Sequence, residues 1–180
     1  MNRITHITRR EFSCALAATA LLPQAALAQT GTAQPIITRA IPGTGERLPV
    51  VGLGTASVFN SDDASTRHAA AQVVQTLVDA GGRLIDTASS YGDAESVLGK
   101  VIAAGALQSK VFVATKLESP DAAELKRSLA RLHAAKVDLL QLHNVRDPQQ
   151  SLAQFRAWKA QGLCRYIGIT STYHGDFAAV

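Results

Sequence analysis

The feature that most constrains this chain is a repeat of short apolar runs, each followed by a segment with helical periodicity. The runs begin at intervals of 27 to 32 residues, near Val51, Arg83, Val111, Asp138 and Tyr166. That interval is the length of one strand plus one helix. Because strands that alternate with helices pair in parallel, the repeat predicts an α/β fold with a parallel sheet covered by helices.

The residues around the helical segments predict where some of them begin and end. The segment 66–80 predicts a helix that stops at Gly81, since glycine commonly ends a helix. Its apolar side is expected to be buried and consists of Val73, Val74 and Leu77. A later helix is expected to be capped by Ser119, which is followed by a proline and an acid.

Two architectures fit this alternation: an open doubly wound sheet and a closed eight-stranded (β/α) barrel. The open sheet usually carries a glycine-rich phosphate loop after its first strand. The corresponding residues 52–57 read GLGTAS and lack the third glycine of that loop. Two short runs around Gly43-Thr44-Gly45 predict a hairpin that precedes the first parallel strand.

The barrel is favoured by ionisable residues at the ends of three successive strands. These strands end in LID, VATK and LQLH, with Asp86, Lys116 and His143 as their last polar residues. Because the carboxyl ends of parallel strands meet at one edge, the three side chains should converge there if those faces point inward. Tyr91 lies in the loop that follows Asp86. Active sites of (β/α) barrels lie at this edge.

These four residue types can act together on a carbonyl group. Asp86 can hold Lys116 charged and oriented, and a cation beside Tyr91 stabilises its phenolate form. Tyr91 then becomes a usable general acid near neutral pH, while His143 directs the substrate oxygen. The sequence shows no nucleophilic serine or cysteine dyad. The attacking species is therefore expected to be a hydride from a cofactor.

Five stretches of the chain resemble the aldo/keto reductase family in order and spacing: LPVVGLGT, IDTASSYGDAESVLGK, VFVATKL, DLLQLH and YIGIT. The resemblance runs from about residue 36 to the end of the chain. It implies a (β/α)8 TIM barrel with an N-terminal hairpin that closes the bottom, and NADPH bound in an extended form at the top.

The resemblance also implies the site residues. By position, the family's catalytic tetrad corresponds to Asp86, Tyr91, Lys116 and His143, with Tyr91 as the proton donor. The cofactor NADP(H) is expected to contact Gly54, Thr55, Asp86, Thr170 and Ser171. Thr170-Ser171 stands where the family usually has Ser-Asn against the nicotinamide amide, so this chain has one amide group fewer there.

The expected function is that of an NADPH-dependent oxidoreductase that reduces an aldehyde or ketone to an alcohol. Two alternatives stay open: a catalytically silent scaffold that binds nucleotide or a partner protein, and a non-functional remnant. The particular carbonyl substrate, the choice between NADP and NAD, and the oligomeric state are also left open by the sequence.

The strand count differs from that of a closed barrel. Five parallel strands are expected, whereas a (β/α)8 barrel has eight in about 250 residues. The chain is therefore expected to be a truncated barrel of about five β/α units, with residues 36–180 as its partial domain. Two unpaired edge strands would make such a chain unstable or prone to aggregate.

The first 28 residues have the pattern of a secretory signal, followed by a linker at 29–35. Arg9-Arg10 precedes a short apolar run, and Ala26-Leu27-Ala28 provides a cleavage site. Paired arginines at this place favour a twin-arginine signal, although a Sec signal or an amphipathic helix also fits. We therefore expect a periplasmic or secreted protein, exported by the twin-arginine translocase and without a stable membrane anchor.

Charge and cysteine content exclude some functions. The leader holds three arginines and one glutamate, so its removal lowers the formal charge from +4 to +2. Residues 29–180 contain no basic cluster mixed with aromatic residues, which argues against nucleic-acid binding. The same part has one cysteine, Cys164, which excludes an intrachain disulfide, and it has no spacing typical of metal ligands.

A few further residues receive structural predictions. Two loops of the substrate pocket are expected after the first parallel strand, at Val58 and Phe59, and after the third, at Leu117 and Glu118. Phe155, Trp158 and Cys164 are expected to pack in the interior, whereas His68 and His133 are expected to be exposed.

Overall fold

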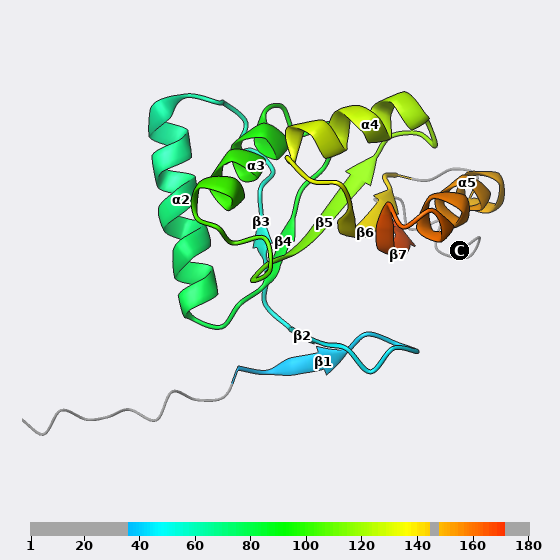
Figure 1. Ribbon diagram of the computed structural model, residues 1–180, viewed down its shortest axis with the longest axis horizontal. Coiled ribbons are helices and arrows are strands. Elements are labelled where there is room, and N and C mark those ends of the chain that lie inside the picture. The colour runs from blue at the N-terminus through cyan, green and yellow to red at the C-terminus, as the bar shows by residue number, and fades with distance from the viewer. Residues whose placement is uncertain (1–35, 145–147, 172–180) are drawn as a thin grey trace, which may run out of the picture. The chain divides into compact units, whose positions relative to one another are not determined.

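The structure is a computed structural model that describes residues 36–144 and 148–171 (Figure 1). The predicted signal sequence 1–28 and linker 29–35 lie outside the described residues.

The described residues contain a parallel sheet whose strands pair in chain order. Its strands are β3 (Leu53–Gly54), β4 (Leu84–Asp86), β5 (Phe112–Leu117), β6 (Val137–Leu142) and β7 (Cys164–Ile169). Each begins within about two residues of the predicted position, so the predicted α/β alternation is confirmed. In the register, Asp86 lies beside Gly54 on one side and Ala114 on the other.

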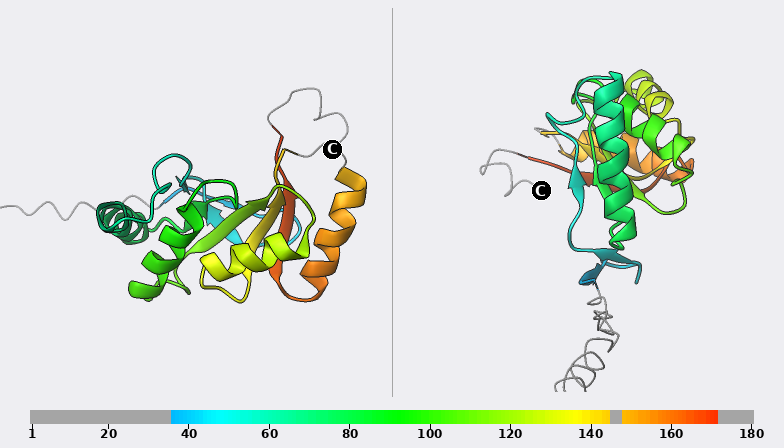
Figure 2. Two further views of the ribbon diagram at one scale, coloured as in Figure 1. Left: turned by 90° about the horizontal axis from the view of Figure 1, so that it is seen from above. Right: turned by 90° about the vertical axis from the view of Figure 1, so that its left-hand side faces the viewer.

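Four helices connect the described strands and cover one side of the sheet (Figures 1 and 2). They are α2 (Ala64–Asp79), α3 (Ala94–Ala104), α4 (Ala122–Arg131) and α5 (Pro148–Ala160). Each helix follows one strand and precedes the next, as parallel pairing requires. The other face of the curved sheet carries the ionisable side chains at the strand ends.

The predicted hairpin is present as β1 (Thr38–Ala40) paired antiparallel with β2 (Arg47–Pro49). Its turn needs glycine at two places, because Gly43 and Gly45 have φ of 74° and 72°. Glu46, at the end of this turn, contacts Arg165 and Tyr166 near the start of β7. The hairpin is thus tied to the amino end of the sheet.

The helix predicted at 66–80 is present as α2, within two residues of its predicted bounds, but one side chain expected on its buried face is not buried. Helix α2 starts at Ala64, because the Asp63 carboxylate accepts a hydrogen bond from the Thr66 N–H at 2.8 Å and forms the N-cap. Val73 is 45% exposed, whereas Val74 is fully buried. Neighbouring helical residues point about 100° apart, so both cannot face the sheet.

The cap of α4 also differs from the prediction. Asp121, and not Ser119, is the N-cap, and its carboxylate accepts from the N–H groups of Ala123 and Glu124. A carboxylate directly before the first helical residue reaches these donors, whereas Ser119 lies two residues too early.

The core lies between the helices and the sheet. Its aromatic pair, Phe155 and Trp158, is buried with ring centroids 5.2 Å apart, as predicted. Cys164 is buried too, and burial raises the pKa of its thiol. His68 and His133 are exposed. Within the described ranges, no helix is both long enough and apolar enough to traverse a bilayer.

Candidate active site

The four residues predicted to act together lie at the carboxyl end of the sheet. Asp86 ends β4, Lys116 is the next-to-last residue of β5, and His143 directly follows β6. The side chain of Lys116 contacts both Asp86 and Tyr91, and the His143 ring contacts the Tyr91 ring. The predicted convergence of the four side chains is therefore observed.

Lys116 is the centre of the cluster. Its Nζ donates to Asp86 Oδ2 at 2.5 Å, to the Thr87 carbonyl at 2.9 Å and to the Tyr91 hydroxyl oxygen at 3.3 Å. An ammonium group has three N–H donors, and these contacts use all three. Only 7% of the Lys116 side chain is exposed, against 39% for Asp86. The carboxylate thus compensates a cation that is almost removed from water.

The loop between β4 and α3 places Tyr91 over this lysine. Its first part stays paired with β5, because the N–H of Ser89 donates to the Lys116 carbonyl at 2.9 Å. The chain then turns at Gly92, which has a φ of 56°. A Cβ at Gly92 would lie 3.0 Å from the Asn60 carbonyl oxygen. A glycine is therefore needed for the loop to close against its neighbour and hold Tyr91 in place.

His143 has a carboxylate partner that the sequence analysis did not assign to it. Its Nδ1 lies 2.5 Å from Glu118 Oε1, and its ring meets the Tyr91 ring edge-on, with centroids 5.8 Å apart and planes at 80°. Burial pushes the pKa of Glu118 up. Hydrogen bonds from Ser90 and His143, together with the charges of His143 and Lys116, outweigh burial and hold this pKa below its usual value.

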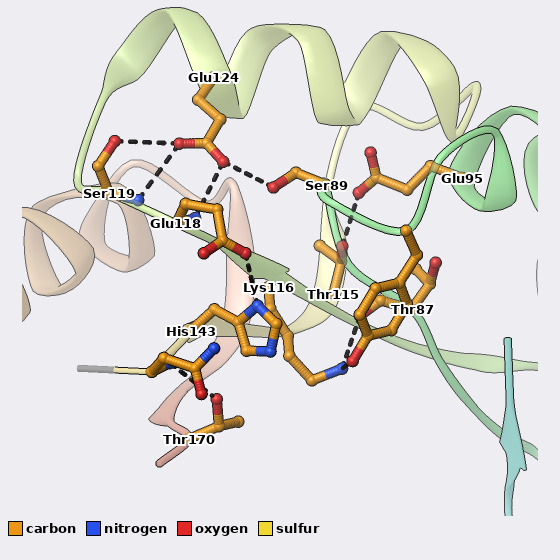
Figure 3. A network of polar contacts seen from close by, with 12 residues as sticks. Thr87, Ser89, Glu95, Thr115, Lys116, Glu118, Ser119, Glu124, His143 and Thr170 are labelled. Atoms are coloured by element: carbon orange, nitrogen blue, oxygen red, sulfur yellow. Dashed lines mark hydrogen bonds and ion pairs between the residues drawn. The ribbon is translucent and has the colours of Figure 1, made fainter. Parts of the chain in front are cut away.

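A second carboxylate, Glu124 of α4, joins the two loops that carry these groups (Figure 3). Its Oε1 accepts from the Ser89 hydroxyl at 2.6 Å and from the Glu118 N–H at 2.9 Å. Its Oε2 accepts from the Ser119 hydroxyl at 3.0 Å. The loop of Tyr91 and the loop of Glu118 are therefore fixed to one helix.

A third carboxylate, Glu95 of α3, lies between the sheet and the helices and is 1% exposed. It accepts hydrogen bonds from the hydroxyls of Thr115 and Ser128 and from the Arg131 guanidinium. The sequence analysis missed it. Its signal was an acid at the start of a largely apolar helix, together with a serine and an arginine three residues apart on the next helix.

The residues expected to contact the cofactor lie on β3 and just after β7. Gly54 is exposed, and a Cβ there would meet no atom within 4 Å. The buried Thr55 donates its hydroxyl to the Asp86 carbonyl at 3.0 Å. The Thr170 hydroxyl accepts from the Asn144 N–H at 3.2 Å, and the half-buried Ser171 follows it.

These residues fit a nicotinamide cofactor. The open space at Gly54 leaves room beside Asp86, and hydroxyl groups after β7 can bond a carboxamide. Within the described part of the chain, no group of three or more His, Cys, Asp or Glu residues is arranged to hold a metal ion.

Two residues of the loops expected to border the substrate pocket are instead buried in the core. Phe59 is 4% exposed and Leu117 is fully buried, and both pack into the core between sheet and helices. Val58 is 60% exposed. Leu117 is buried because side chains alternate along a strand. Its neighbour Lys116 faces the site, so Leu117 faces the core. Glu118 lies beside His143 and so remains at the site.

Comparisons of sequence give a consistent result. Residues 50–180 match the aldo/keto reductase family. An aldo-keto reductase of Mycolicibacterium smegmatis is 34% identical over 133 residues, which is 68% of this chain and 44% of that protein. One of Mycobacterium tuberculosis is 35% identical over 137 residues, 69% of this chain and 45% of that protein. The chain spans about half the length of the curated relatives it matches.

Solved structures give the same fold. The thermostable aldo-keto reductase Tm1743, in complex with the inhibitor epalrestat, matches with a TM-score of 0.66 and 28% identity, over 74% of this chain and 53% of that one. An aldo/keto reductase of Klebsiella pneumoniae, solved with NADP and acetate, matches with a TM-score of 0.65 and 27% identity, over 76% and 50%. The strands β3 to β7 with helices α2 to α5 are thus consecutive β/α units of a TIM barrel, and the chain belongs to the aldo/keto reductase family.

Proposed function

We propose that this chain is an NADP(H)-dependent oxidoreductase that reduces an aldehyde or ketone to an alcohol, with Tyr91 as the proton donor. One observation carries the proposal: the buried Lys116 ammonium contacts both the Asp86 carboxylate and the Tyr91 hydroxyl oxygen. A phenol beside a cation that a carboxylate holds in place is arranged to lose its proton.

The chain's own residues have distinct parts in this reaction. When Tyr91 gives its proton to the substrate oxygen, negative charge remains on its own oxygen, 3.3 Å from Lys116 Nζ. The ammonium group, of a side chain that is only 7% exposed, stabilises that charge more strongly than it could in bulk solvent. Asp86 keeps Lys116 charged and oriented. His143, whose ring lies against Tyr91, bonds the same substrate oxygen and fixes its direction.

NADPH, when bound, supplies the hydride that adds to the carbonyl carbon. Thr170 and Ser171 would hold its carboxamide, while Gly54 leaves room for it beside Asp86. The support from known proteins is that aldo-keto reductases of Klebsiella pneumoniae were crystallised with NADPH and with NADP.

The test measures NADPH oxidation by the purified chain with a panel of aldehydes and ketones. Tyr91→Phe is expected to lower the rate by roughly 10²–10⁴-fold, because it removes the proton donor but keeps the ring. Tyr166→Phe, at the other end of the sheet, is the matched control and should keep the rate. A rate that survives Tyr91→Phe would refute the assigned role of Tyr91. Nucleotide binding without turnover on any carbonyl would favour the scaffold alternative.

We also propose that the protein is exported by the twin-arginine pathway and loaded with its cofactor in the cytoplasm. The support is the sequence of the leader, in which Arg9-Arg10 precedes a short apolar run and a cleavage site. The intact mass of the protein from its source cells should correspond to a chain that starts at Gln29. Replacement of both arginines by lysine should retain the protein in the cytoplasm, and export of that variant would contradict the assignment.

A further inference from the structure

The contact between Glu118 and His143 fixes which ring nitrogen carries a proton. Glu118 Oε1 lies 2.5 Å from Nδ1. The Glu118 side chain is 47% exposed, so its carboxyl group is ionised at neutral pH, as glutamates in contact with water are. An ionised carboxylate only accepts hydrogen bonds. Nδ1 must therefore be the donor in this pair.

This assignment determines what Nε2 can do. If Nδ1 always carries a proton, the neutral His143 ring has a lone pair at Nε2, and only the doubly protonated ring has an Nε2–H group. A carbonyl oxygen accepts hydrogen bonds but cannot donate one. Neutral His143 therefore cannot hold a carbonyl through Nε2, although it can accept from the hydroxyl of an alcohol.

We propose that Glu118 is a positioning residue that locks His143 in its Nδ1–H form, so that the ring holds a carbonyl oxygen only as an imidazolium and an alcohol hydroxyl only as a neutral imidazole. This inference rests on the proposed reductase function. It makes the direction of the reaction depend on pH through one side-chain contact. Carbonyl reduction is favoured when His143 carries both ring protons, and alcohol oxidation when it carries one.

The groups around the ring support this role for Glu118. Two loops present groups to the His143 ring. The β4–α3 loop presents the Tyr91 ring, and the β5–α4 loop presents Glu118. The nearby Lys116 is paired with Asp86, which leaves Glu118 as the carboxylate in contact with the imidazole among the described residues. Figure 3 shows the ring beside Lys116 with one nitrogen joined to Glu118.

The backbone of Glu118 is itself held in place. Its N–H donates to Glu124 at 2.9 Å, and the same carboxylate oxygen accepts from Ser89. His143 is held from the other side, since its N–H donates to the Leu117 carbonyl at 2.8 Å. Because both residues have fixed backbones, the contact between their side chains is preorganised.

The first experiment measures the protonation of the His143 ring nitrogens directly and does not depend on catalysis. The ¹⁵N chemical shifts of His143 in the purified chain report which nitrogen is protonated, and His143→Gln identifies its signals. The neutral ring of the unchanged protein is expected in the Nδ1–H form. Glu118→Gln should allow the Nε2–H form, because the new amide N–H can donate to Nδ1. The exposed His68 and His133 serve as references that should not change.

Two results of this measurement would overturn the proposal. One is a neutral His143 in the Nε2–H form in the unchanged protein. The other is the same ring form in Glu118→Gln as in the unchanged protein. Glu118→Asp keeps the carboxylate and should retain the Nδ1–H form, at least in part. Asp79→Asn removes a surface charge from the end of α2 and should leave the ring unchanged.

The second experiment uses the pH profile. In the unchanged protein, kcat/KM for carbonyl reduction should fall by up to about tenfold per pH unit once His143 loses its second ring proton. Glu118→Gln should remove this step, because its neutral ring can offer Nε2–H. A step that persists in Glu118→Gln would contradict the proposal. Absence of reduction at every pH would instead refute the proposed function, while the ring measurement would still decide the role of Glu118.

Discussion

The two ends of the sheet each place a tyrosine in a cluster of charged groups, but the phenols have opposite partners. At the carboxyl end, the Tyr91 oxygen accepts from the Lys116 ammonium at 3.3 Å. At the amino end, the Tyr166 hydroxyl donates to the Glu46 carboxylate at 2.6 Å. A cation favours loss of the phenol proton, whereas a carboxylate favours its retention. The same residue type thus accepts from a cation at one end, as its proposed role in proton transfer requires, and donates to a carboxylate at the other.

The amino-end cluster pairs its charges within the protein. Arg165 donates to Asp138 at 2.7 Å and also contacts Glu46. These hydrogen bonds, the one to Asp138 most of all, raise the pKa of Arg165 above its usual value. The hydrogen bond from Tyr166, and then those with Arg165, hold the pKa of Glu46 below its usual value. This cluster ties the hairpin to β6 and β7. Its place agrees with the general division of (β/α) barrels, in which chemistry lies at the carboxyl end and stability at the amino end.

The largest expected difference between the two ends concerns their cations. Lys116→Met should reduce carbonyl reduction by roughly 10²–10⁴-fold, because Tyr91 loses the charge that stabilises its phenolate form. Its effect on the free energy of unfolding should stay within about 1 kcal/mol, because Asp86 is 39% exposed and can be hydrated. Arg165→Met should show the reverse, with activity kept and stability lost.

The size of that stability loss follows from what Arg165 leaves behind. Its removal takes the cation away from Glu46 and Asp138, whose side chains are 21% and 22% exposed, and leaves each carboxylate with one hydrogen bond among the described residues, from Tyr166 and from the Val113 N–H. We expect a loss of about 2 kcal/mol, below the ~3–5 kcal/mol of a fully buried pair because Arg165 itself is 37% exposed. Urea unfolding and NADPH oxidation measure both quantities on each variant. Equal loss of activity in the two variants would remove the distinction between the ends.

Acid should weaken the amino end in a defined direction. The folded pKa of Glu46 lies below the ordinary glutamate value of 4.5, so its ionised form stabilises the fold above that pH. This contribution is lost as the pH falls from 4.5 through the folded pKa. Glu46→Gln should therefore be less stable than the unchanged protein near neutral pH, and the difference should shrink in acid. Urea unfolding over this range tests the expectation.

A carboxyl-end variant provides the comparison for this pH effect. Glu118 also has a lowered pKa, with hydrogen bonds and nearby charges outweighing burial, so its contribution has the same sign. Because its side chain is 47% exposed, Glu118→Gln should change acid stability less than Glu46→Gln. A larger effect at Glu118 would show that the carboxyl end contributes more to stability than its exposure suggests.

The sequence predicted the parts of the fold and site that depend on neighbouring residues. The strand-and-helix interval located β3 to β7. An ionisable residue at the end of an apolar run was enough to select Asp86, Lys116 and His143, because alternation places such a residue on the face opposite to the core. The N-caps of helices are harder to predict, because several nearby polar residues compete for the position. The cap of α4 is Asp121, whereas the sequence predicted Ser119.

The supporting carboxylates could not be predicted in the same way. Glu118 contacts a residue 25 positions away, and Glu95 contacts residues 20 to 36 positions away. Such pairs depend on the register of neighbouring strands and on the rotation of each helix about its axis, which a single sequence does not determine. Strand alternation predicts that Lys116 points inward. It makes no prediction for Glu118, because β5 ends at Leu117.

The smallest expected effect belongs to the hydrogen bond that supports the loop of Tyr91. Ser89→Ala removes the hydroxyl that donates to Glu124 at 2.6 Å, and should lower stability by about 1 kcal/mol. Catalysis should fall only a few-fold, because the Ser89 N–H still donates to the Lys116 carbonyl and keeps the loop beside β5. Urea unfolding and carbonyl reduction measure the two changes. A loss of activity as large as that of Lys116→Met would mean that Glu124, and not the backbone pairing, is what positions Tyr91.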